Sequence, residues 1–294
     1  MLCRRAGAAS AKAWIPRVGG AVDREQAVGA HNTGLTGDKT SAFTLLSMNV
    51  AGLRGVLRSP EKSAALRATV AAVRPHLLCL QEHKLQDEHV ADATVALREL
   101  LGGDLGFSSR AAPSSSLFAC SGPPARKGYS GTACLLSDAL PTTLLDSWSG
   151  FPAPLVASRA ADADTDSVHA EGRLVTLEFQ DIVVVNTYTP NSGSKLARLP
   201  HRVAYWDKIM AAYLDWLERH RGKPVCLVGD LNVAHKVQDI HNFYSRPGFP
   251  DRLPEVGAKD HFKGVSALKQ QAGCTAEERL SFTALLASGS GYVD

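Results

Sequence analysis

The most informative motif is Gly-Asp-Leu-Asn at residues 229–232, directly after a short apolar run over 225–228. Such a run predicts a buried strand, so Asp230 and Asn232 would lie at its end, on the rim of a sheet. There a carboxylate can bind a cation or accept a proton from water, and an amide can donate to an oxyanion. The same residues could instead form an Asx turn that closes a core strand. On this motif alone both interpretations stay open.

Polar residues of the same kind follow three other predicted strands. The strand over 44–49 ends in Asn49, and Glu82 follows the strand over 77–81. Across the four strand ends the sequence places two carboxylates, three amides and one phenol: Glu82, Asp230, Asn49, Asn191, Asn232 and Tyr188. If the fold brings these ends to one rim, their oxygen atoms suit Mg²⁺, which keeps several waters and contacts substrate phosphate. Each motif by itself could be only a capped turn.

The elements that must position these residues alternate from about residue 43 to the end of the chain. Apolar and β-branched runs predict strands over 44–49, 77–81, 132–137, 173–179, 182–187 and 225–228. Periodicity and start signals predict helices over 60–73, 199–219 and 276–287. Long loops are expected over 108–127, 157–170 and 239–271. Loops of this length in a compact domain are often functional. Strands that mix with helices and hairpins indicate an α/β sandwich rather than a doubly wound sheet.

Composition and charge are those of an ordinary globular protein. The 294 residues are 45% hydrophobic and 21% charged, and no apolar run is long enough to cross a membrane. The formal net charge of +3 lies in residues 1–40, so the rest of the chain balances at 26 charges of each sign. A polyanionic partner therefore needs a local patch, such as residues 195–223 with seven Lys or Arg and three Asp or Glu.

Cysteine usage and the N-terminal segment bear on the compartment. The six cysteines form no Cys-x-x-Cys pair, so we interpret them as reduced residues of an intracellular protein and expect no zinc site. Residues 1–41 are rich in Ala, Gly and Arg, with no acidic residue before Asp23. They could be an organellar transit peptide or a disordered basic tail ahead of a domain over 42–294. We expect the nucleus, the mitochondrion or another organelle.

Seven motifs make the chain resemble the exonuclease III-type AP endonucleases, which cut DNA beside abasic sites in base excision repair. The motifs are Asn49-x-x-Gly52-Leu53-Arg54, Leu80-Gln81-Glu82-x-Lys84, Gly128-Tyr129-Ser130-Gly131, Glu171-Gly172-Arg173, Tyr188-x-Pro190-Asn191, Arg198-x-x-x-Arg202-x-x-x-Trp206-Asp207 and Gly229-Asp230-Leu231-Asn232-Val233-Ala234-His235. Leu-Gln-Glu and Gly-Asp-x-Asn are shared across the wider endonuclease/exonuclease/phosphatase superfamily. The Gly-Tyr-Ser-Gly, Tyr-x-Pro-Asn and Asp-Leu-Asn-Val-Ala-His elements point to its DNA-repair branch.

The resemblance implies a fold and a reaction. The fold would be a four-layered α/β sandwich, with two mixed sheets flanked by helices. The reaction would be Mg²⁺-dependent hydrolysis of the phosphodiester bond 5′ to an abasic site in double-stranded DNA, with Mn²⁺ as an alternative ion. Activity as a 3′–5′ exonuclease or 3′-phosphodiesterase could accompany it, and the protein would act as a monomer. The alternatives are another phosphodiesterase of the superfamily, acting on 3′ ends or small molecules, and an inactive DNA-binding fragment.

The resemblance also implies residue roles at the reacting phosphate. Glu82 would be the main Mg²⁺ ligand, with Asn49 near the metal. Asp230 would orient or deprotonate the attacking water, and Asn232 would stabilise the transition state, both beside the ion. Tyr188 would contact the scissile phosphate as a hydrogen-bond donor or as a phenolate. A capped strand end for Glu82 and an aromatic with a satisfied hydroxyl for Tyr188 are the structural alternatives.

Further residues would bind DNA. Asn191 would donate to the phosphate region, and His235 would flank the DNA unless it is an ordinary surface histidine. Three side chains would touch the DNA backbone or support that surface: Tyr129, Arg198 and Arg202.

The sequence also departs from the family pattern. Ala51 stands where a metal-anchoring Asp or Asn is common, and Ser194 where an Arg that inserts into DNA is common. The pattern continues to a Trp-x-Leu-Asp segment and a terminal Ser-Asp-His, neither of which follows Asp294. We therefore expect a C-terminally incomplete chain that is inactive or nearly so, with the final strands missing and an open apolar sheet edge.

Overall fold

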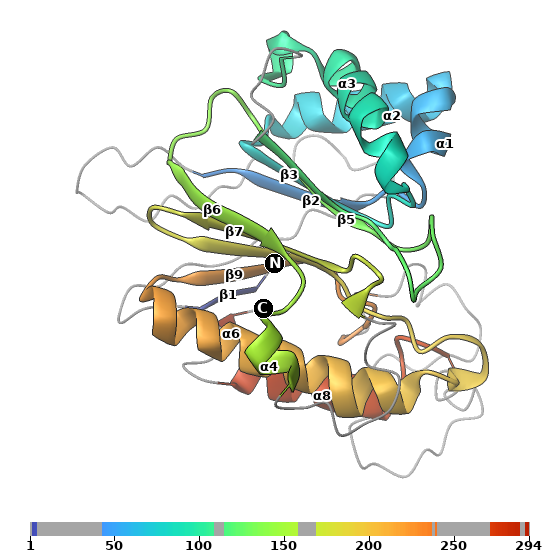
Figure 1. The fold of residues 1–294 in the computed structure, drawn as a ribbon, viewed down its shortest axis with the longest axis vertical. Helices are drawn as coiled ribbons and strands as arrows, with labels where there is room; N and C mark the ends of the chain where they lie inside the picture. Colours follow the sequence, from blue (N-terminus) through green and yellow to red (C-terminus); the bar gives the residue numbers. More distant parts are fainter. Residues whose placement is uncertain are drawn as a thin grey trace.

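Two β-sheets lie face to face, and helices cover their outer faces (Figure 1). The computed structural model describes residues 2–4, 43–108, 115–157, 169–236, 239, 271–288 and 292–293. The predicted four-layered α/β sandwich is confirmed. Residues 5–42 lie outside the described part, so the interpretation of the N-terminal segment stays a prediction.

The first sheet has four strands in the order β2-β3-β5-β4. They are β2 (Leu45–Asn49), β3 (Leu77–Gln81), β5 (Thr132–Leu136) and β4 (Ser116–Ala119). β2 and β3 are parallel, and the other two pairs are antiparallel. The helices α1 (Leu53–Arg58), α2 (Pro60–Val73) and α3 (Val90–Leu101) cover the outer face of this sheet (Figure 1). Two short 3-10 helices, Asp87–His89 and Gly103–Leu105, flank α3.

The second sheet has six strands in the order β10-β1-β9-β8-β7-β6. They are β10 (Tyr292–Val293), β1 (Leu2–Arg4), β9 (Val225–Asp230), β8 (Val183–Tyr188), β7 (Leu174–Phe179) and β6 (Leu144–Ser149). β8 and β9 are parallel. The outer face carries α4 (Ala153–Ala157), α6 (Asp207–Arg221) and α8 (Ala276–Ala287) (Figure 1). β1 pairs with two residues of β9, and β10 pairs with β1, so β10 rather than β9 is the outermost strand described at this edge.

Local signals explain where the main helices begin and end. Ser59 accepts a hydrogen bond from the Lys62 amide at 3.3 Å, and Pro60 occupies the first turn of α2. Thr275 and Glu278 form the predicted capping box of α8. The predicted helix over 199–219 is a π-helical segment, His201–Trp206, that continues into α6 and ends at Gly222 in the left-handed conformation. A further 3-10 turn, Ser194–Leu196, precedes it.

The hydrophobic core has three layers. The interior between the sheets is packed by residues such as Cys79, Cys134, Val184 and Cys226. A second cluster lies under α1, α2 and α3, and a third under α6 and α8. Within the described residues no helix is long and apolar enough to span a membrane.

The predicted loops had mixed outcomes. The stretch 108–127 contains β4, so the prediction of a continuous loop was wrong there, and β6 was not predicted. β4 has only four residues, and both strands lie at sheet edges, where alternation of apolar residues is weak. Most of the predicted loops over 157–170 and 239–271 lies outside the described residues.

Candidate active site

The predicted strand ends meet at one rim of the sandwich. Asn49 ends β2 in the first sheet, and Asp230 ends β9 in the second. The Asn49 amide nitrogen donates to Asp230 Oδ2 at 2.8 Å and to Glu82 Oε2 at 3.0 Å. One amide thus draws together carboxylates from the two sheets, as the sequence predicted for a shared rim.

The backbone that carries Glu82 is tightly turned around a buried histidine. Glu82 and Lys84 have φ angles of 57° and 54°, which non-glycine residues seldom adopt. His83 between them is fully buried, where its Nδ1 accepts from the Leu85 amide and its Nε2 lies 3.1 Å from the Ala119 carbonyl oxygen. Burial lowers the pKa of His83 to about 4, so the ring is neutral and structural. No sequence signal singled out this residue.

Glu82 is held ionised by its neighbours. The Lys84 ammonium lies 2.7 Å from Glu82 Oε1. Burial raises the pKa of Glu82, but hydrogen bonds from Lys84 and Asn49, together with the Lys84 charge, outweigh burial and leave the pKa below its usual value. This corner of the site therefore already attracts one cation.

The donor set fits a hard divalent cation. Glu82 and Asp230 supply carboxylate oxygens on either side of Asn49, and Mg²⁺ in proteins commonly uses one or two carboxylates plus waters. Asn49 Oδ1 accepts from the Ala51 amide at 2.9 Å, so the amide nitrogen faces the carboxylates. Among the residues that the structure describes, no three His, Cys, Asp or Glu side chains gather as a metal site.

Tyr188 stands beside the two carboxylates as a neutral phenol. Its hydroxyl lies near enough to Glu82 and Asp230 for both carboxylate charges to raise its pKa. Burial raises the pKa of Tyr188 strongly, the Glu82 charge adds to this, and the Arg173 charge opposes it only in part. Of the two roles implied by the resemblance, this geometry favours the hydrogen-bond donor over the phenolate.

A buried arginine supports Tyr188 from below. The Arg173 guanidinium lies 4.7 Å from the centre of the Tyr188 ring and 5.5 Å from that of Tyr129, and it donates to the Tyr188 carbonyl oxygen at 2.9 Å. It forms an ion pair with Glu171, which also accepts from Arg198 at 3.1 Å. The sequence analysis quoted Glu171-Gly172-Arg173 as a motif but gave Arg173 no role.

The two predicted asparagines bind each other. Asn191 Nδ2 donates to Asn232 Oδ1 at 3.1 Å, and Asn232 Nδ2 donates to the Thr189 carbonyl oxygen at 2.7 Å. The Asn232 backbone amide donates to Asp230 Oδ1 at 3.0 Å. The Asn232 side chain therefore bonds the neighbouring loop, and direct ligation of a metal by Asn232 stays a prediction.

Arg202 is a support rather than a DNA contact. Its side chain is 2% exposed and donates to the carbonyl oxygens of Leu231 at 2.8 Å and of Pro190 at 3.2 Å. Its Nε donates to Asp207 at 2.8 Å. Arg202 thus joins the loop after β8 to the loop after β9.

The remaining predicted DNA contacts lie around this centre. Arg198 is 31% exposed and lies 3.4 Å from the Tyr129 hydroxyl, so these two form one surface. His235 contacts α8, where its Nε2 lies 2.9 Å from Thr283 Oγ1 and its ring meets Phe282 edge-on.

Gly229 allows the two sheet strands that carry Tyr188 and Asp230 to approach closely. Its φ angle is 132°, and a Cβ atom at this position would collide with the Thr187 carbonyl oxygen. In the parallel register, Thr187 is opposite Gly229 and Tyr188 is opposite Asp230. The first residue of the Gly-Asp-Leu-Asn motif is therefore a steric requirement of the site.

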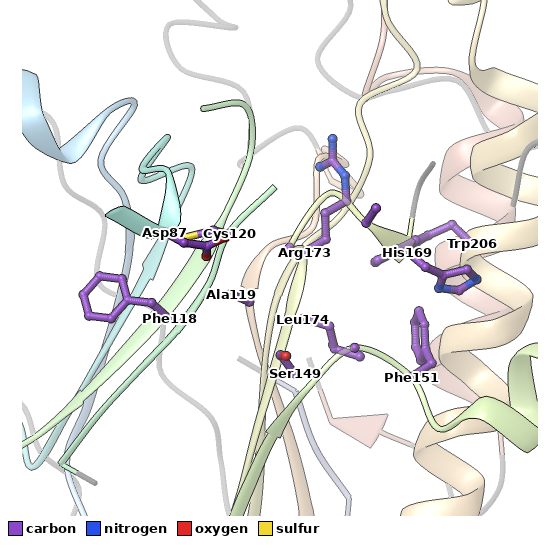
Figure 2. Close-up of a pocket in the computed structure, with 13 residues that line it drawn as sticks. Asp87, Phe118, Ala119, Cys120, Ser149, Phe151, His169, Arg173, Leu174 and Trp206 are labelled. Atoms are coloured by element: carbon purple, nitrogen blue, oxygen red, sulfur yellow. The ribbon is translucent and has the colours of Figure 1, made fainter. Parts of the chain in front are cut away.

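A cavity of about 290 Å³ adjoins the site behind Arg173. Figure 2 shows Asp87, Phe118 and Cys120 on one side of it, and Phe151 and Trp206 on the other. Burial raises the pKa of the Cys120 thiol to about 12, so this group is not an activated nucleophile. The sequence gave no sign of this cavity.

Comparison with known proteins places the chain in a family. The sequence profile of the Endonuclease/Exonuclease/phosphatase family matches residues 46–284. The chain belongs to this endonuclease/exonuclease/phosphatase family. It is 32% identical over 249 residues to an exodeoxyribonuclease of Streptococcus pneumoniae (strain TIGR4), covering 83% of this chain and 74% of that protein.

Two further relatives of the family agree with this placement. A DNA-(apurinic or apyrimidinic site) endonuclease of Dictyostelium discoideum is 30% identical over 251 residues, covering 85% of this chain and 52% of that protein. The crystal structure of AP endonuclease LMAP from Leishmania major is similar with a TM-score of 0.55 and 28% identity, covering 84% of this chain and 66% of that chain. This chain thus spans about three quarters of the pneumococcal relative and about half of the Dictyostelium relative.

Proposed function

We propose that the chain is a Mg²⁺-dependent DNA phosphodiesterase that hydrolyses the phosphodiester bond 5′ to an abasic site in double-stranded DNA. The observation that carries the proposal is the junction of Glu82 and Asp230 through Asn49 at the rim of both sheets. The names of the relatives, exodeoxyribonuclease and AP endonuclease, support DNA as the substrate.

Glu82 and Asp230 would hold the ion, for which Mn²⁺ is the expected substitute. When bound, a divalent cation there stabilises negative charge on the phosphate and lowers the pKa of water. Asp230 accepts hydrogen bonds from Asn49 and from the Asn232 amide, which keeps the carboxylate in place to orient water and accept its proton. The Glu82 pKa, below its usual value, keeps that carboxylate ionised at neutral pH.

The other residues would act on the phosphate and the DNA backbone. The neutral Tyr188 phenol can donate a hydrogen bond to a phosphate oxygen, where it stabilises the charge of the transition state. Arg198 and Tyr129 form a cationic surface with a hydroxyl group next to it, suited to the backbone. Asn191 and Asn232 hold the loops on which Asp230 depends.

A cleavage assay on three substrates tests the proposal. The substrates are a duplex with one abasic site, an intact duplex with recessed 3′ ends, and a phosphoinositide, each with Mg²⁺ or with EDTA. We expect incision 5′ to the abasic site that EDTA abolishes and that Glu82→Gln lowers at least a hundredfold. The control Glu178→Gln removes an ion-paired carboxylate at the opposite end of β7 and should retain activity.

The position of the cut, rather than its rate, decides this assay. Cleavage of none of the three substrates, or Mg²⁺ dependence that survives Glu82→Gln, would contradict the proposal.

A 3′ exonuclease is the second candidate, favoured by the 32% identity to a protein named exodeoxyribonuclease. Nucleotide release from recessed 3′ ends that outpaces abasic incision would select it. We further propose that the protein acts as a monomer in the nucleus or an organelle, which light scattering and cell fractionation would test.

A further inference from the structure

Two amide side chains meet in the interior between the sheets. Gln81 ends β3 in the first sheet and Asn186 lies in β8 of the second, and they are 1% and 0% exposed. Gln81 Nε2 donates to Asn186 Oδ1 at 2.7 Å. The surrounding layer is built from apolar side chains and cysteines, among them Cys79 and Val184. Asn and Gln side chains are seldom fully buried in an apolar layer, so this pair is expected to have a role other than packing.

The Asn186 side chain bonds the opposite sheet with both its polar atoms. Its Nδ2 donates to the Ala133 carbonyl oxygen in β5 at 3.0 Å and to the Leu80 carbonyl oxygen in β3 at 3.3 Å. Gln81 Nε2 is also anchored within its own sheet, by Ser47 Oγ at 3.0 Å. One side chain of β8 is thus fixed to two strands of the facing sheet.

These hydrogen bonds fix the position of one sheet relative to the other, which apolar packing alone does not. Contacts between apolar side chains have no strong direction, so two packed sheets can shift slightly at little cost. A buried hydrogen bond depends on distance and angle, and a buried amide that loses its partner is destabilising. A shift of one sheet against the other would break the bonds of Asn186 at once.

The bridge lies directly beneath the candidate active site. Gln81 precedes Glu82, and Asn186 lies two residues before Tyr188. In the β8–β9 register, Asn186 is opposite Val228, two residues before Asp230. The bridge therefore joins the strands that carry Glu82 on one side and Tyr188 and Asp230 on the other.

Above this bridge, two carboxylates from different sheets face the same amide. Glu82 and Asp230 both accept a hydrogen bond from the Asn49 amide nitrogen. Two negatively charged carboxylates held beside the same donor repel each other. A bridge between the underlying strands opposes this repulsion before a cation binds.

We propose that Gln81 and Asn186 are positioning residues that set the separation of Glu82 from Asp230 and thereby the affinity of the site for a divalent cation. The inference rests on the proposed function, because it takes the Glu82–Asp230 rim as the metal site. Neither amide touches the ion or the DNA.

Replacement of Asn186 tests this inference through Mn²⁺ affinity, measured by isothermal titration calorimetry on the whole chain. Asn186→Leu keeps the number and branching of the side-chain heavy atoms and removes the bonds to the first sheet. We expect it to raise the Mn²⁺ Kd about tenfold, as loss of a residue that orients metal ligands commonly does. The Mg²⁺ concentration for half-maximal cleavage of DNA should rise in parallel, while kcat at saturating Mg²⁺ falls much less.

Thr176→Val is the matched control. Thr176 is also fully buried, in the neighbouring strand β7, and its hydroxyl lies 2.7 Å from the Tyr213 hydroxyl in α6 of the same half. This variant loses a buried hydrogen bond that does not join the sheets. We expect a lower Tm and an unchanged Mn²⁺ Kd.

The variants and the wild type separate the possible failures. If Asn186→Leu does not fold, Asn186→Thr, which keeps a buried hydroxyl, is measured instead. A folded Asn186 variant whose Mn²⁺ Kd stays within twofold of the wild-type value would overturn the inference, as would a Thr176→Val variant that weakens binding equally. A wild-type chain that binds Mn²⁺ but cleaves no DNA contradicts the proposed function alone, whereas one that binds no Mn²⁺ overturns both.

Discussion

The two halves of the candidate active site are held in different ways. On the second sheet, Tyr188 and Asp230 stand over two buried, hydrogen-bonded arginines, Arg173 and Arg202. On the first sheet, Glu82 sits on a turn with a left-handed backbone and pairs with Lys84, whose side chain is 40% exposed. The second half is thus held by buried hydrogen bonds, whereas the first half keeps its charge close to solvent, where a cation can compete for it.

The largest expected effect comes from removing the support of the second half. Arg202→Met leaves Asp207 buried without its partner and the carbonyl oxygens of Leu231 and Pro190 without a donor. We expect the free energy of unfolding to fall by about 3 to 5 kcal/mol, measured by urea denaturation. Arg202→Met with Asp207→Leu should recover part of this loss. A loss below about 1 kcal/mol for the single variant would show that Arg202 does not hold the second half.

The pH dependence of stability tests the support of the first half. His83 has a pKa near 4 in the folded chain, below its ordinary value of 6.5, so the unfolded state binds the proton first as pH falls. The free energy of unfolding should therefore rise between about pH 4 and 6.5, by about 3 kcal/mol. His83→Gln should remove most of this rise in the free energy of unfolding with pH. His220→Gln in α6 should leave the rise unchanged. A wild-type chain with no slope in this range would be at odds with a neutral buried ring.

Tyr188→Phe tests the role of the hydroxyl group that lies where the two halves of the site meet. The variant keeps the ring over Arg173 but removes the hydroxyl that, by proposal, donates to the phosphate. We expect kcat on abasic DNA to fall about a hundredfold with little change in Tm. Because the pKa of Tyr188 is raised, the wild-type rate should not increase between pH 8 and 10. A rate that climbs through this range in the wild type and not in the variant would favour the phenolate.

The smallest effect is expected at the exposed ion pair. Lys84→Met removes the cation next to Glu82 Oε1. The free energy of unfolding should change by less than about 1 kcal/mol, as for other exposed pairs, while Mn²⁺ binds a few times more tightly because a competing charge is gone. Calorimetry measures both quantities. Weaker Mn²⁺ binding would mean that Lys84 holds Glu82 in its binding geometry instead.

The sequence predicted the elements and most of the rim because both depend on local patterns. Apolar runs placed β3, β8 and β9, and the capping signals placed the starts of α2 and α8. The convergence of Asn49, Glu82 and Asp230 followed from strand ends that carry polar residues.

Long-range contacts could not be predicted in the same way. Arg202 and Arg173 look like surface residues in a sequence, and only the fold shows that each lies buried among carbonyl oxygens and rings. Gln81 and Asn186 are 105 positions apart, and nothing local to either indicates the other. The pairing of β9 with β1 joins segments more than 200 positions apart.

Gly229 has a consequence for the mutational tolerance of the motif. Every substitution there adds a Cβ atom against the Thr187 carbonyl oxygen, so β8 and β9 would have to separate and Tyr188 would move away from Asp230. In a library that samples all amino acids at residues 229–232, position 229 should therefore accept fewer replacements than Leu231, although Gly229 contributes no chemical group. The site is constrained by the space left between two strands as much as by the residues that perform chemistry.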